Sequence, residues 1–212
     1  MITCLKFGKE RSVAYISHLD VIRAFERTFR RAKLPLAFSQ GFSPRPKMVF
    51  GQPLPLGLTS SGEYVDITLE KEMSEKEVLA RLEETMPPGF VLYEAKNLDD
   101  SVKPIMSVIT HASYLFLGDS TKEILKALEY ENIPYVRERK GKKQVQDLRP
   151  LIETINICEG GVKVVAKAGS RANLRPDALI CALGLDKGEI RVHRENLFLQ
   201  KDGKLISPLM RS

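Results

Sequence analysis

Apolar and polar positions alternate in two stretches of the first 70 residues. Residues 2 to 7 read as a short strand, and residues 63 to 70 alternate more cleanly. In the second stretch Val65, Ile67 and Leu69 are expected to face the core, while Tyr64, Asp66 and Thr68 are expected to face outward. Both stretches therefore predict strands.

A helical period lies between these strands, and a second one follows them. Ser17 with Asp20 forms a capping pattern, and Pro35 limits the other end, so we expect a helix from about 18 to 33. Ser74 with Glu77 opens a second helix that ends before Pro87, and residues 90 to 95 supply a strand. The order β-α-β-β-α-β is that of ferredoxin-like folds.

The second half repeats this order in pattern, although not in residues. Strands are expected at 113–118 and 190–200, with hairpins within 135–148 and 154–168 and a helix opening at Pro176. We therefore expect an α+β protein of two ferredoxin-like (βαββαβ) units in tandem, with antiparallel sheets and helices on one face. The expected domains are residues 1–98 and 105–212, the second with an extra hairpin.

Composition narrows the class of protein. No apolar run is long enough for a membrane span and the start of the chain resembles no secretory signal, so we expect a cytoplasmic protein. Cys4, Cys158 and Cys181 are widely spaced, which predicts neither disulfides nor a metal site, and no nucleotide cofactor motif is present. The formal net charge of +6 favours polyanionic partners.

Four arginines share one face of the first expected helix. At about 100° per residue, Arg23, Arg27, Arg30 and Arg31 fall within an arc of roughly 100°, opposite the apolar side chains. One interpretation is an ordinary solvated face, with Glu26 pairing with Arg30. The other is phosphate contact, because guanidinium groups suit bidentate binding to phosphate.

The loop after this helix adds further cations. Gly41 permits a turn, while Pro44 and Pro46 hold Arg45 in an extended segment that continues to Lys47. Phe42 either stacks on a base or anchors the loop. We predict that Arg23, Arg27, Arg30, Arg31, Arg45 and Lys47 form one nucleic-acid-binding surface.

The stretch from Ser17 to Lys47 and on to about residue 70 resembles the signature of a bacterial domain family described as radical-SAM-linked, of undefined function. The positions that match the signature are Ser17, His18, Asp20, Gly41, Phe42, Pro44 and Pro46. The resemblance implies a radical SAM enzyme as partner. This chain lacks a CxxxCxxC motif, so it is not expected to carry the iron–sulfur chemistry itself.

Three functions follow as hypotheses. The first is a non-catalytic RNA-binding module that positions structured RNA, tRNA or rRNA, for a radical SAM modification enzyme. The second is a metal-independent ribonuclease or RNA-modifying enzyme with His18 as general base, since a helix N-terminus favours neutral imidazole; the alternative is a hydrogen-bonded structural His18. The third is a module that docks on a radical SAM subunit through the same arginines.

Overall fold

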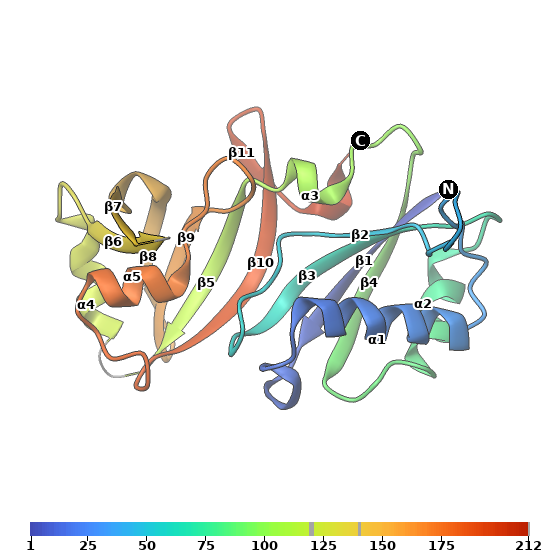
Figure 1. Cartoon of the computed structure of the whole chain (residues 1–212), viewed down its shortest axis with the longest axis horizontal. Coiled ribbons are helices and arrows are strands. Elements are labelled where there is room, and N and C mark those ends of the chain that lie inside the picture. Colours follow the sequence, from blue (N-terminus) through green and yellow to red (C-terminus); the bar gives the residue numbers. More distant parts are fainter. Residues whose placement is uncertain (119–120, 140, 212) are drawn as a thin grey trace.

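The structure is a computed structural model that describes residues 1–118, 121–139 and 141–211. It is a mixed α+β fold, as expected, built on one large and mostly antiparallel sheet (Figure 1). The sheet runs in the order β4-β1-β3-β10-β5-β9-β8, with β2 added at β3 and β11 at β10. The hairpin of β6 and β7 stands apart from this sheet.

The first half contains four strands and two longer helices. Their bounds are β1 (Ile2–Lys9), α1 (His18–Arg31), β2 (Met48–Phe50), β3 (Thr59–Thr68), α2 (Glu75–Glu83) and β4 (Phe90–Leu98), with the 3-10 turn η1 (Arg11–Val13) before α1. Neighbours in the order β4-β1-β3-β2 are all antiparallel. The two helices predicted from their caps are confirmed, because Ser17 and Ser74 accept hydrogen bonds from the amides of Asp20 and Glu77 at 3.2 Å.

The second half has the same strand order with insertions. Its elements are α3 (Ile105–Val108), β5 (His111–Leu117), α4 (Lys122–Leu125), η3 (Lys126–Leu128), β6 (Pro134–Arg139), β7 (Lys142–Asp147), η4 (Arg149–Leu151), β8 (Ile152–Cys158), β9 (Gly161–Lys167), α5 (Pro176–Ala182), β10 (Arg191–Lys201), β11 (Lys204–Ile206) and η5 (Pro208–Met210). Neighbours in the order β10-β5-β9-β8 are antiparallel. Both predicted hairpins are present.

The two halves share one sheet, whereas the sequence predicted two separate sheets. Strand β3 pairs with β10 in parallel, at Thr59 with His193 and Ser60 with Arg194. Gly62 permits this approach, because a Cβ there would lie 2.3 Å from the Cα of Asn196. The join depends on backbone pairing between residues about 130 positions apart, which local periodicity does not encode.

A buried ion pair lies at the join. The guanidinium of Arg194 is fully buried and donates to both carboxylate oxygens of Glu63, with Nε to Oε1 at 2.7 Å. Its Nη2 also donates to the carbonyl of Gln52 at 2.7 Å. Arg194 on β10 therefore holds β3 and the segment after β2 in place.

Helix α1 packs on the sheet through aromatic side chains. Phe25 lies 4.6 Å from Phe7 and 5.4 Å from both Phe50 and Phe90, measured between ring centroids. Helix α1 ends two residues earlier than expected, where Lys33 takes a positive φ of 51°. The aromatic cluster fixes which face of α1 points to solvent.

The outward orientation predicted for Tyr64 and Asp66 is wrong, because both side chains are buried. They lie on the face of the sheet opposite α1, where α3 and η5 cover them. The amide of Ile105 donates to Asp66 Oδ2 at 3.0 Å, and Arg211 pairs with the same carboxylate. The alternation of apolar and polar residues correctly assigned the side chains of β3 to two faces of the sheet. It did not predict that α3 and η5 cover the face opposite α1.

Candidate nucleic-acid interface

Helix α1 presents its four arginines to solvent, as its periodicity predicted. Arg23 Nη1 pairs with Asp20 at 3.4 Å, and Arg31 Nη2 donates to the carbonyl of Thr85 at 2.6 Å. Arg27 and Arg30 form no ion pair within the described part of the chain, so the suggested pairing of Glu26 with Arg30 is absent there. At 1.5 Å per residue, the arginines from Arg23 to Arg31 form a basic row of roughly 12 Å along the helix.

The loop after α1 is a narrow ribbon with an exposed tip. Phe38 and Pro46 form a bridge, and the Ser39 amide donates to the carbonyl of Arg45 at 2.9 Å. The side chain of Phe42 at the tip is fully exposed, so it does not anchor the loop. Gly41 has a φ of +135°, which is consistent with the turn predicted there.

Arg45 and Lys47 are exposed along this ribbon. Among the described residues, no hydrogen bond or ion pair joins either of them to an arginine of α1. Pro46 and Lys47 instead line a pocket with Met48 and Asp66 on the opposite face of the sheet. The helix arginines and the loop cations are therefore all exposed, and the prediction that they form one nucleic-acid-binding surface stays a prediction.

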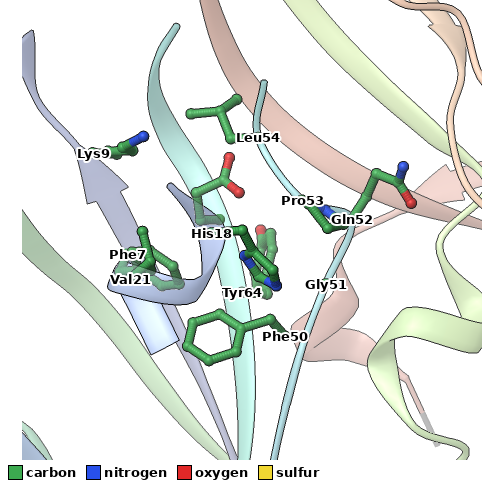
Figure 2. Close-up of a pocket in the computed structure, with 11 residues that line it drawn as sticks. Phe7, Lys9, His18, Val21, Phe50, Gly51, Gln52, Pro53, Leu54 and Tyr64 are labelled. Atoms are coloured by element: carbon green, nitrogen blue, oxygen red, sulfur yellow. The ribbon is translucent and has the colours of Figure 1, made fainter. Parts of the chain in front are cut away.

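His18 lies half-buried at the first turn of α1. Its ring meets Phe50 edge to face, with 5.5 Å between centroids, and Figure 2 shows it beside Phe50 and Tyr64. Lys9 and Glu63 complete the pocket, whose cavity volume is about 20 Å³. This volume holds about one water molecule and excludes a nucleotide.

Lys9 positions the segment that leads into α1. Its ammonium group is almost fully buried and donates to the carbonyls of Ala14 and Ile16 at 3.0 and 3.3 Å. Burial lowers the pKa of Lys9, an effect that Glu63 opposes. These two hydrogen bonds fix the backbone on either side of Tyr15.

His18 and His193 are expected to titrate below the ordinary histidine pKa of 6.5. Burial lowers the pKa of both, and at His18 the charge of Lys9 acts in the same direction while Glu63 opposes it. The folded chain then binds these protons more weakly than the unfolded chain. Their contribution to stability is full above about pH 6.5 and is lost as pH falls through the lower folded pKa. NMR titration of the imidazole resonances measures these pKa values, with the urea-unfolded chain as control. A titration midpoint at or above 6.5 for His18 would contradict the prediction.

A groove between the two halves begins at the N-terminal end of α1. It has a cavity volume of about 300 Å³ and is lined by Arg11, Tyr15, residues 56–58, Asp177, Ile180, residues 187–188 and residues 190–192. Tyr15 is 70% exposed, and the guanidinium of Arg11 lies over its ring at 5.6 Å from the centroid. Arg11 Nη1 also contacts the carbonyl of Gly57 at 3.4 Å.

Basic side chains outnumber acidic ones in this junction groove. Arg11, Lys187 and Arg191 line it together with a single carboxylate, Asp177, which Arg175 engages at 2.7 and 3.1 Å. An exposed aromatic ring beside guanidinium groups suits an unstacked base and its phosphate. The sequence did not predict this groove, because Arg11 lies far along the chain from Lys187 and Arg191. The closeness of Arg11 and Tyr15 in the sequence was the one local feature that could have indicated it.

The fold and the site define a mixed α+β protein with an exposed row of arginines on α1 and a basic groove that contains Arg11 and Tyr15. None of the helices in the described ranges is long and apolar enough to span a membrane. The chain belongs to a family of uncharacterized proteins conserved in bacteria (DUF2344), which matches residues 3–176. Membership of a bacterial family of undefined function, expected from the 17–70 signature, is thereby confirmed.

Comparisons with curated proteins and with solved structures do not extend this family assignment. No curated protein matches the chain. Among solved structures 21 chains match, and one of them belongs to a Cbf5-Nop10-Gar1 complex, with a TM-score of 0.47 and 13% identity. The match covers 97% of this chain and 52% of the chain in that complex, so this chain spans about half the length of the matched chain.

Proposed function

We propose that this protein is an RNA-binding accessory module that positions structured RNA, such as tRNA or rRNA, for a radical SAM modification enzyme. Two observations support the proposal: the exposed arginines of α1, and the basic junction groove that is lined by Arg11 and Tyr15 just before the same helix. Arg27 and Arg30 are exposed without acidic partners among the described residues, and Tyr15 lies just before α1 with Arg11 over its ring.

The two parts of this surface suit different parts of an RNA. Guanidinium groups spaced along α1 neutralise successive phosphates and release counterions, which contributes affinity without reading sequence. Tyr15 offers a flat ring on which one unstacked base can stack. Lys9 donates to the carbonyls of Ala14 and Ile16, and these two hydrogen bonds fix the backbone that carries Tyr15. Such a surface favours a structured RNA with a helical backbone and an accessible base.

The proposed partner follows from the 17–70 signature, which resembles radical-SAM-linked domains. We infer that the radical SAM enzyme supplies the iron–sulfur cluster and the chemistry, while this chain holds the RNA. We also infer that the two halves are ferredoxin-like units in tandem. In each half one helix follows the first strand and another precedes the last, and the strand orders β4-β1-β3-β2 and β10-β5-β9-β8 are equivalent. A cytoplasmic location fits RNA as the ligand.

Two alternatives have partial support. A ribonuclease or RNA-modifying enzyme using His18 is supported by burial, which lowers the pKa of His18 and keeps the ring neutral, but the adjacent pocket admits only about one water. A protein-docking module is supported by two exposed leucines: Leu56, which lines the junction groove with Tyr15, and Leu19 in the first turn of α1.

Replacing Tyr15 with alanine tests the stacking role. Loss of one stacked base costs about 1–3 kcal/mol, so the Kd for tRNA or rRNA is expected to rise roughly 5- to 150-fold, while Tyr15→Phe retains binding. Phe42→Ala is the matched control, because Phe42 is also an exposed aromatic residue but does not line the junction groove. Binding is measured by fluorescence anisotropy at low salt.

The outcomes separate the three functions. Failure of the unmodified chain to bind RNA overturns the proposal. Cleavage or modification of bound RNA that is lost in His18→Ala favours the enzyme. Co-purification with a radical SAM protein that survives nuclease and requires Arg27 and Arg30 favours docking instead of RNA binding.

A further inference from the structure

A further polar pocket is lined by Ser107 of α3, by Thr110 and His111 at the start of β5, and by the loop after β9. It forms where β9 ends and β5 begins, and its cavity volume is about 330 Å³. The polar side chains that line it are Ser107, Thr110, His111, Lys167, Ser170, Arg171 and Gln200. This volume falls in the range of small-ligand sites.

The loop after β9 places backbone donors at this pocket. The Ala168 amide donates to the Thr110 carbonyl, and the Leu174 amide donates to the Lys167 carbonyl, both at 2.8 Å. Between them, the amides of residues 169–172 donate to no acceptor within the described part of the chain. Successive free amides in a tight loop form a concave site for an anion.

Glycine is required where this loop turns. Gly169 has a φ of +129°, and a Cβ there would lie 2.4 Å from the carbonyl oxygen of Ile109. Gly169 is buried, whereas Ser170 and Arg171 beside it are exposed, and all three residues line the pocket. Its position holds the loop against the segment before β5, and both segments line the pocket.

Charge at the pocket is net positive. Lys167 Nζ lies 3.8 Å from Glu153 Oε1, and His111 Nε2 lies 3.3 Å from the same oxygen. Arg171 is exposed and has no ion pair in the described ranges. The carboxylate of Glu153 thus contacts Lys167 and His111, and the guanidinium fork of Arg171 is available for an oxyanion.

We propose that residues 167–172 bind a phosphate group, with the free amides of the loop and the guanidinium of Arg171 as donors. Lys167 adds a compact positive charge, and Thr110, whose hydroxyl lies 2.9 Å from His111 Nδ1, also lines the pocket. The phosphate belongs to a small phosphorylated molecule or to a nucleic-acid backbone, since both present the same oxygens. This site stands independently of the α1 surface.

Titration with inorganic phosphate tests the site. Backbone amide resonances of residues 169–172 are expected to shift and saturate in the millimolar range, whereas sodium chloride at equal ionic strength leaves them unchanged. Arg171→Gln is expected to weaken the binding at least tenfold. Arg175→Gln is the matched control, because Arg175 pairs with Asp177 and does not line the pocket. This variant is expected to keep the phosphate affinity of the unmodified chain.

Two further ligands identify the source of the phosphate. Binding of AMP at this loop without binding of an oligonucleotide that has only internal phosphodiesters indicates a small phosphorylated ligand; oligonucleotide binding indicates a nucleic-acid backbone. Adenosine is the control for both. Shifts that follow ionic strength alone, or equal loss of binding in the Arg171 and Arg175 variants, overturn the proposal.

Discussion

Arg194→Leu is expected to lower the free energy of unfolding by about 3–5 kcal/mol, because it leaves the buried carboxylate of Glu63 without its partner. The same change removes the hydrogen bond to the carbonyl of Gln52 at the join between β3 and β10. Urea unfolding with linear extrapolation measures the loss. No other ion pair in the described residues has a partner that is completely buried.

A double variant separates the ion pair from the packing. Glu63→Leu combined with Arg194→Leu is expected to be more stable than Arg194→Leu alone, because no unpaired charge remains. Arg23→Leu is the matched control, since Arg23 pairs with Asp20 at the surface and its loss should cost about 0.5 kcal/mol or less. A similar cost for Arg194→Leu and Arg23→Leu would contradict this account of the join.

Arg27→Gln with Arg30→Gln is expected to weaken RNA binding roughly 25- to 60-fold at 0.1 M salt. Each phosphate contact contributes about 0.7–0.9 to the slope of log K against log salt, so two contacts remove 1.4–1.8 log units relative to 1 M salt. Anisotropy titrations across a salt series measure both the affinity and the slope. The fold should be unaffected, because both side chains are exposed and have no ion pair among the described residues.

The matched control removes the same charge elsewhere. Arg137→Gln with Lys143→Gln neutralises two exposed cations on the β6–β7 hairpin, which lies outside the main sheet. This variant is expected to retain nearly all of the affinity. Equal losses in the two double variants would show that net charge alone governs binding, and the α1 surface would then have no special role.

The candidate site was predictable where its geometry is local. Helix α1, its Ser17 cap and its exposed arginines all follow from spacing within about 15 residues, because one turn of helix fixes which side chains share a face. The link between this face and the 39–47 loop was a matter of tertiary placement. There the structure shows a loop with its own exposed Phe42, and it also shows a groove, lined by residues of both halves, that the sequence did not predict.

The sequence by itself determined the element order, the capped helices, the hairpins and the solvent-facing side of α1. Only the tertiary structure decided the parallel join of β3 to β10, the burial of Tyr64 and Asp66, and the meeting of Arg11 and Tyr15 with Arg191. The physical reason is that apolar periodicity records that a face is buried, but not which distant segment buries it. Contacts such as Arg194 with Glu63 satisfy buried charge across 131 positions, and that pairing emerges only when the whole chain folds.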